Sequence, residues 1–290
     1  MNVIEFLLAG TVAAALPMLL AALGEMVVEK TGLLNLGLEG MMALGAVIAF
    51  ICVYETGSHV LGFGVAACAG AAFAMIFAGL ALGVKANEVA AGLGLSVLGL
   101  GLSALFGKSY ESLTISGLPK IGLPVISEIP VIGPTLFTQD IVVWLTIIGA
   151  FALWYLLTRT KIGLVISAIG ENSTAARAIG YPVSAIQCAA IAFGGALCGL
   201  AGAYASTVYT PLWADGMIAG RGWIAVALVV FGAWKTGRVV FGALLFGLLS
   251  LGELTAQAAG VALPSQLLSS LPYIITILML VVISKRNLVS

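Results

Sequence analysis

Long apolar segments recur from one end of this 290-residue chain to the other, with few charged residues between them. Hydrophobic residues make up 61% of the sequence and charged residues only 8%, whereas soluble domains carry about 25% charged residues. A helix needs about 20 predominantly apolar residues to cross a bilayer, and this chain supplies that length repeatedly. The sequence therefore predicts an all-α, polytopic helical membrane protein.

Apolar segments of suitable length predict about 8–10 transmembrane helices. We place them at residues 4–23, 36–54, 60–84, 88–106, 138–158, 183–209, 218–234, 239–258 and 266–284. The segment 218–234 is short and contains Arg221, which is also compatible with a half-helix. Because no polar stretch is long enough to build a water-soluble domain, we expect residues 1–290 to form a single transmembrane domain.

Basic residues are distributed unevenly between the two sides of the membrane that alternating helices define. One side receives Lys30, Lys85, Arg159, Lys161, Arg177, Lys235, Arg238, Lys285 and Arg286. The other side receives only Lys108, Lys120 and Arg221. By the positive-inside rule the first side is cytoplasmic, so we expect a cytoplasmic C-terminus. The side of the N-terminus depends on whether residues 24–36 form a loop or a further broken helix.

The longest polar interruption runs from Arg159 to Pro182. Within it, Asn172 or Ser173 can cap a short helix that ends before Gly180. Isolated helices shorter than about 12–15 residues are marginal in water, so this one must be held against lipid headgroups or a partner protein. We interpret residues 159–182 as a cytoplasmic docking segment; the alternative is a basic loop that only satisfies the positive-inside rule.

Residues 24–45 combine acidic and amide side chains with glycines inside apolar sequence. Polar residues at membrane depth are costly unless they line a cavity or a protein interface. Asn35 and Glu39 are four residues apart, which would put them on one face of a helix. Two interpretations stay open: a discontinuous helix that lines a path, or an interfacial loop followed by an ordinary span.

Two further polar sites lie at predicted helix starts. Asn87 can cap the helix that begins near residue 88, where the negative charge of Glu88 is favourable; this capping role is favoured over a ligand contact. Arg221, between two glycines, faces either a pathway or lipid headgroups. Close helix packing is expected at Gly92, Gly94, Gly99 and Gly101.

Residues 107–137 form the one long loop on the outer side. Four prolines break any helix there: Pro119, Pro124, Pro130 and Pro134. The apolar residues between them indicate a segment packed on the protein surface. Loops this long are often functional, so this one either receives a delivered substrate or plugs the outer face.

Enzyme chemistry has no recognisable signature in the sequence. Neither H-E-x-x-H nor G-x-S-x-G occurs. The four cysteines have no C-x-x-C spacing and the chain has a single histidine, so we expect no metal site. The stretch 101–109 has five residues between its glycines, not the four of a phosphate loop, so we expect no ATP or other cofactor on this chain. A net charge of zero gives no indication of nucleic acid.

Four stretches carry a resemblance to a known family: TGLLNLGLEGMMALGA (31–46), KANEVAAGLGLS (85–96), GENSTAARAIGYP (170–182) and GRGWIAVALVVFGAW (220–234). With the helix pattern, the chain resembles the permease subunits of ABC importers for ribose, simple sugars, nucleosides and branched-chain amino acids. The similarity covers essentially the whole chain. It is closest to the nucleoside and simple-sugar branch, and to the shorter of its two paired permeases.

The resemblance implies a multi-pass permease of a bacterial or archaeal cytoplasmic membrane that is not itself an enzyme. It implies three partners: an ABC ATPase, a second similar permease in a heterodimer, and an extracytoplasmic solute-binding protein. The residues that match the family's coupling segment are Gly170, Glu171, Asn172, Ala175, Ala176, Arg177 and Gly180. The residues assigned to the substrate pathway are Asn35, Glu39, Asn87, Glu88, Ser96 and Arg221.

One position departs from the family pattern and leaves the solute open. Ser96 stands where the nucleoside-type GLxLN pattern has an asparagine, which weakens the case for a nucleoside. Riboflavin and other sugar-like solutes are handled by similar permeases and remain alternatives. A stand-alone secondary carrier or channel is the alternative from another class, but an intramembrane charge chain for proton coupling is missing from the sequence.

Overall fold

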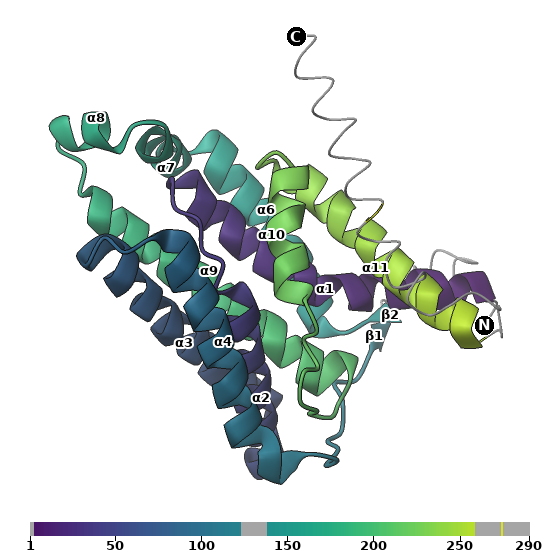
Figure 1. Ribbon diagram of the computed structural model, residues 1–290. Coiled ribbons are helices and arrows are strands. Elements are labelled where there is room, and N and C mark those ends of the chain that lie inside the picture. The colour runs from purple at the N-terminus through teal and green to yellow at the C-terminus, as the bar shows by residue number, and fades with distance from the viewer. Residues whose placement is uncertain (1–2, 123–137, 259–273, 275–290) are drawn as a thin grey trace.

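The computed structural model describes residues 3–122, 138–258 and 274 (Figure 1). Its long helices are α1 (Val3–Lys30), α2 (Leu38–Thr56), α3 (His59–Ala78), α4 (Glu88–Gly107), α6 (Ile141–Arg159), α9 (Val183–Tyr204) and α11 (Thr236–Ala258). Three helices are shorter: α7 (Lys161–Glu171), α8 (Ser173–Ala178) and α10 (Arg221–Phe231). Single turns of other helix types are η1 (Gly79–Gly83), η2 (Lys108–Tyr110) and η3 (Ala205–Tyr209).

The predicted all-α, polytopic membrane architecture is confirmed. Seven helices in the described part of the chain are long and apolar enough to cross a membrane. The segment expected at 218–234 contains α10, which has only 11 residues, as the half-helix interpretation predicts. Apart from residue 274, the segment expected at 266–284 lies outside the described residues, as do the basic residues beyond it and the C-terminus.

The first helix differs from its expected bounds and resolves the role of residues 24–36. We expected 4–23, whereas α1 continues to Lys30; Glu25 is buried and accepts a hydrogen bond from the Asn35 amide, and the partly buried Glu29 accepts one from Trp234. Residues 24–30 are therefore neither a loop nor a separate helix. Only residues 31–37 lie between α1 and α2.

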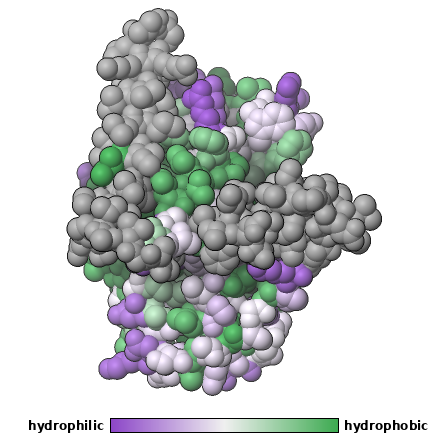
Figure 2. Space-filling model, turned by 90° about the vertical axis from the view of Figure 1, so that its right-hand side faces the viewer, coloured by the Kyte–Doolittle hydropathy of each residue, from purple (hydrophilic) through white to green (hydrophobic). Residues whose placement is uncertain are grey.

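Helix α9 lies at the centre of the bundle and packs on α1, α2 and α3, while α4 packs on the far side of α2. Helices α10 and α11 pack on α1, and α7 and α8 lie together at one end of the bundle, at the top of Figure 1. On the face shown in Figure 2, hydrophilic side chains gather toward the upper and lower edges, with hydrophobic ones between the grey segments. This distribution is the one expected of a chain that spans a bilayer.

The outer loop is described only in part. Its first half is tied to the segment after η3, where the Ile115 amide donates to the carbonyl of Pro211 at 3.1 Å. A two-residue strand β1 (Ile121–Gly122) pairs antiparallel with β2 (Thr138–Gln139) at the other end of the loop. The described residues thus pack on the protein, as expected, whereas Pro124, Pro130 and Pro134 lie outside them.

Glycines allow the central helices to approach each other backbone to backbone. An added Cβ at Gly45 or Gly70 would overlap the backbone of α9, and one at Gly202 would overlap the carbonyl oxygen of Met42 in α2. Small residues at helix contacts are the usual means of close packing in membranes. The α9 helix can therefore touch both α2 and α3 only because it carries glycine at these crossings.

We expected close helix packing at four glycines of α4, and the structure confirms it for two of them. Gly92 lies against Leu36 and Gly37, and Gly99, seven residues on, lies against Gly40 in α2; an added Cβ at either would meet backbone atoms. Gly94 and Gly101 have open space beside them, so no helix in the described part of this chain packs closely on them. The two pairs lie on different faces of one helix, and the sequence does not indicate which face is covered.

Replacing Gly202 by alanine should destabilise the protein, since the new methyl group has no space against Met42. Overpacking of this kind costs typically about 1–3 kcal/mol. The matched control is Gly101→Ala, which adds a methyl group into open space and raises helix propensity. Thermal unfolding in detergent should show a lower Tm for Gly202→Ala and an unchanged or higher Tm for Gly101→Ala. Equal Tm values would contradict the close approach of α2 and α9.

Candidate functional site

The connection between α1 and α2, residues 31–37, is non-helical and yet buried. Thr31, Leu33 and Asn35 are almost inaccessible, with Asn35 only 2% exposed. Irregular backbone inside a membrane protein is tolerated only where the protein itself or a water-filled cavity satisfies its polar groups. The amides and carbonyls of this connection must therefore have partners within the fold.

Side chains from three helices supply those partners. Glu25 of α1 accepts from the Asn35 amide at 2.9 Å, and Glu88 of α4 accepts from the Leu34 amide at 2.9 Å. Carbonyl groups are satisfied by Ser96 of α4, which donates to Leu36 at 2.8 Å, and by Gln187 of α9, which donates to Thr31 at 3.1 Å. The Asn35 side chain closes the turn by accepting from the Gly37 amide at 2.9 Å.

Glu39, in the first turn of α2, joins this region to the start of α10. Its two carboxylate oxygens accept from the backbone amides of Gly220 and Gly222, at 2.6 and 2.7 Å. Glu39 is only 4% exposed. The carboxylate thus satisfies two of the amides that the first turn of a helix leaves without intrahelical partners, and its charge matches the positive end of the α10 dipole.

Arg221 begins α10 beside this carboxylate. Its guanidinium lies over the ring of Tyr209, 5.3 Å from the ring centroid, and the side chain is half-buried. Arg221 therefore stands at the start of a short helix, in contact with a ring of the same chain. A half-helix whose positive end is directed at buried polar groups is the arrangement that membrane transporters use to bind polar solutes and ions within the bilayer.

Five of the six predicted pathway residues come together around the α1–α2 connection and the start of α10. They are Asn35, Glu39, Glu88, Ser96 and Arg221. Asn87 does not join them, because its exposed side chain caps α4 by accepting from the Ala90 amide at 3.0 Å, as the capping interpretation predicted. Contact of any of these residues with a solute stays a prediction.

The structure differs from one detail of the sequence interpretation. Asn35 and Glu39 do not share a helical face, because α2 begins only at Leu38. The connection is not a solvated loop, since most of it is buried against the neighbouring helices. Glu25 and Gln187 were not singled out as site residues, although an acidic or amide side chain inside an apolar run was the signal that could have identified both.

The predicted coupling segment consists of two helices, of which the sequence indicated only the second. Helix α8 is capped by Asn172, which accepts from the Ala175 amide at 2.9 Å, as predicted. Helix α7 buries Gly163, Ile166 and Ile169, and Ile169 packs with Ala176 of α8. The two short helices therefore hold each other against the bundle.

The seven predicted coupling residues divide into two groups. Gly170, Asn172, Ala176 and Gly180 shape the segment: Gly180 adopts a φ of 96°, Ala176 is buried, and an added Cβ at Gly170 would overlap the carbonyl oxygen of Lys30. The exposed residues without such a role are Glu171, Ala175 and Arg177. They are the members of the set that are free to contact a partner.

The end of α1 connects the coupling segment with the buried connection. Gly170 of α7 lies against Lys30 and Gly32. On another side, the Trp234 indole, in the turn between α10 and α11, donates to Glu29 at 2.7 Å. A displacement of α7 would therefore press directly on the residues that lead into the α1–α2 connection.

Comparison with known proteins identifies relatives over nearly the whole chain. A family described as the branched-chain amino acid transport system permease component matches residues 7–284. The chain is 38% identical to the putative glucose ABC transporter permease protein TsgC13 of Haloferax volcanii, over 94% of this chain and 90% of that protein. It is 31% identical to the nucleoside ABC transporter permease protein NupC of Lactococcus lactis, over 96% of this chain and 92% of that protein.

A further relative is the guanosine ABC transporter permease protein NupQ of Bacillus subtilis, which is 31% identical over 96% of this chain and 92% of that protein. No solved structure shows significant similarity to the chain.

Replacing Glu39 by glutamine should destabilise the junction of α2 and α10. The amide retains one acceptor oxygen, so one of the two backbone amides loses its partner, and the negative charge beside Arg221 disappears. Leaving a buried donor unsatisfied costs about 1–3 kcal/mol. Thermal unfolding in detergent should show a lower Tm for Glu39→Gln than for the control Glu111→Gln at an exposed loop position. Indistinguishable Tm values would contradict the capping role of Glu39.

Proposed function

Because this chain belongs to the permease family of branched-chain amino acid transport systems, we propose that it lines one half of the path of an importer for a simple sugar or a nucleoside. The chain is an ABC importer permease, a transport subunit rather than an enzyme. We assign ATP binding and hydrolysis to a separate subunit, delivery of the solute to an extracytoplasmic binding protein, and the other half of the path to a second, similar permease. The membrane is then a bacterial or archaeal cytoplasmic membrane.

The coupling segment is the observation that carries this proposal. On its surface it leaves large apolar side chains beside charged ones: Leu164 is 70% exposed and Ile179 is 74% exposed, near Arg177. Apolar side chains rimmed by charged and polar residues mark protein interaction sites. Because this surface lies on the side that the positive-inside rule makes cytoplasmic, we assign it to contact with the ATPase.

The contacts of α1 could transmit movement from the ATPase to the solute path. Movement of α7 would act through Gly170 on Lys30 and Gly32, and through them on the α1–α2 connection. That connection leads directly to Glu39, which holds the start of α10. We infer that α10 and the connection change their relative position during transport, so that the carboxylate of Glu39 alternates between the α10 amides and other partners.

A simple sugar is the solute that we favour over a nucleoside. The relative named as a putative glucose permease is more similar, at 38% identity, than the two nucleoside permeases, at 31%. Ser96 agrees with this choice, because it stands where the nucleoside-type pattern has an asparagine. A polar solute also suits the junction of α2 and α10, where amides, a carboxylate and a guanidinium converge.

Charge reversal at Arg177 should uncouple the importer. In the complex with its ATPase, reconstituted in lipid vesicles, Arg177→Glu should lower solute-stimulated ATP hydrolysis while the chain still inserts, since the side chain is exposed and makes no hydrogen bond or ion pair with the described residues. The control is Arg238→Glu, an exposed arginine on the same predicted side but outside the segment. If Arg177→Glu hydrolyses ATP like wild type, residues 159–182 serve only as a topology signal.

The importer should take up a sugar in preference to a nucleoside. Cells that express this chain with its co-purifying partners should accumulate labelled glucose in an ATP-dependent manner, and unlabelled guanosine should compete poorly. Strong competition by guanosine, with weak competition by hexoses, would assign a nucleoside instead. Accumulation that persists without the ATPase would contradict the importer assignment itself and favour a stand-alone carrier.

A further inference from the structure

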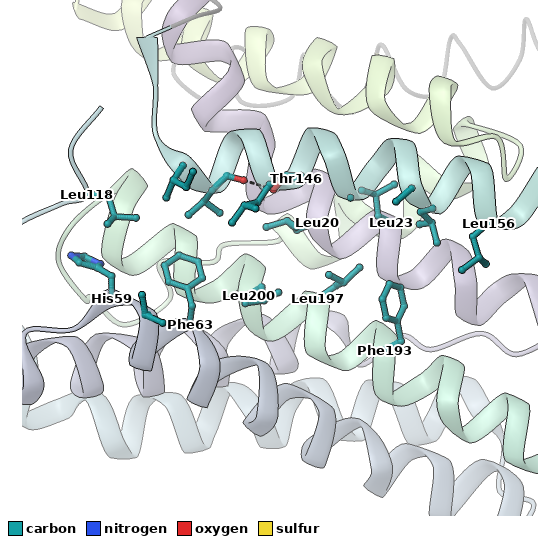
Figure 3. Close-up of a pocket in the computed structure, with 17 residues that line it drawn as sticks. Leu20, Leu23, His59, Phe63, Leu118, Thr146, Leu156, Phe193, Leu197 and Leu200 are labelled. Carbon is teal, nitrogen blue, oxygen red and sulfur yellow. Dashed lines mark hydrogen bonds between the residues drawn. The ribbon is translucent and has the colours of Figure 1, made fainter. Parts of the chain in front are cut away.

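Two apolar cavities of about 590 and 560 Å³ lie one after the other between α6 and α9. They share the lining residues Leu153, Leu156 and Phe193, so they form one continuous groove, which we call the α6–α9 groove. Figure 3 shows its first part, with His59 and Phe63 at one end and Leu156 and Phe193 at the other. The groove is separate from the buried connection and from Glu39.

The lining of the groove excludes a sugar or nucleoside as its occupant. Leucines of α1 form its floor, and apolar residues of α6 and α9 form its walls. Thr146 is the only hydroxyl in the first cavity, and it donates to the carbonyl of Val142 within its own helix at 2.8 Å. Between His59 at one end and Lys161 and Tyr181 at the other, the described lining offers a polar solute no free hydrogen-bonding group to replace its bonds to water.

One end of the groove is cationic. Lys161, the first residue of α7, and Tyr181 line the second cavity, and both are exposed. Neither side chain makes a hydrogen bond or ion pair with any residue in the described part of the chain. Lys161 lies on the predicted cytoplasmic side, where basic pockets between transmembrane helices bind anionic lipid headgroups.

We propose that the α6–α9 groove binds a phospholipid of the cytoplasmic leaflet, with an acyl chain along the groove and an anionic headgroup at Lys161 and Tyr181. An apolar groove cannot stay empty without loss of van der Waals contacts, and lipid tails are as apolar as its leucines. Among the described lining residues, Lys161 is the one cation, and it lies at the end of a largely apolar groove, which matches an amphiphile with one anionic end.

The bound lipid has a consequence for α7. Ile162, Val165 and Ile166 of α7 line the same cavity as Lys161, so an acyl chain there packs beneath the helix that leads into α8. This consequence, unlike lipid binding, rests on the proposed function of residues 159–182 as a coupling segment. Lipid retention is therefore measured without reference to transport.

The first test fills the groove. Gly149 lines it and has open space for a side chain, and Gly101 has equal space on α4, outside the groove. Native mass spectrometry of the purified full-length chain with its partners, titrated with phosphatidylglycerol, should show a tightly retained lipid in wild type and Gly101→Leu. Gly149→Leu should lose it. Retention of that lipid by Gly149→Leu would overturn the proposal.

The second test removes the cation. Lys161→Gln should lower the preference for phosphatidylglycerol over phosphatidylcholine about fivefold, the effect of one cation near an anionic lipid. Lys235→Gln, an exposed lysine on the same predicted side, should leave the preference unchanged. An unaltered preference in Lys161→Gln would overturn the headgroup assignment.

The third test identifies the occupant in native membranes. A photoreactive benzoylphenylalanine at position Ala152, inside the groove, should form adducts with the mass of a phospholipid. Adducts with a second permease, with another copy of this chain, or with residues 259–290 of the same chain would show that protein covers the groove, and would overturn the proposal.

Discussion

Non-helical backbone inside a membrane protein must find every hydrogen-bond partner within the protein, because the bilayer core offers none. The connection between α1 and α2 is such a backbone. Its amides at Leu34 and Asn35 are held by Glu88 and Glu25, and each of those carboxylates comes from a different helix. This requirement explains why a chain with so few charged residues keeps acidic side chains in its interior, and it fixes the positions of α1, α2 and α4 relative to one another.

Glu39 satisfies buried backbone amides in the same way at the start of α10. Helix α10 starts inside the protein, and its first amides would be unsatisfied without the carboxylate that α2 presents. The approach is close because Gly222 has no side chain: an added Cβ would overlap Glu39. Close packing at glycine and satisfaction of buried amides are thus interdependent. Together they create a polar junction within apolar surroundings, and this junction is the place that we propose for the solute path.

Local sequence patterns predicted a large part of this structure. Apolar segment length located the long helices, and the Asn172 cap and Asn87 cap followed from residue type and spacing. Pairings across the chain could not be predicted in this way. Glu39 and Gly222 are 183 residues apart, and Gln187 and Thr31 are 156 residues apart. The periodicity of the sequence does not predict contacts over such separations. Helix α7 was missed because its 11 residues were taken as part of a loop, although its apolar residues recur at helical spacing.

The proposed function depends most on contact between residues 159–182 and an ATPase. The direct measurement places a photoreactive side chain at Leu164, on the exposed face of α7, and identifies its adducts in native membranes by mass spectrometry. If the segment contacts an ATPase, the adduct should contain an ATP-binding subunit, and the same subunit should co-purify with the chain in mild detergent. Adducts with lipid alone, from a homo-oligomer that contains no ATPase, would contradict the proposed function.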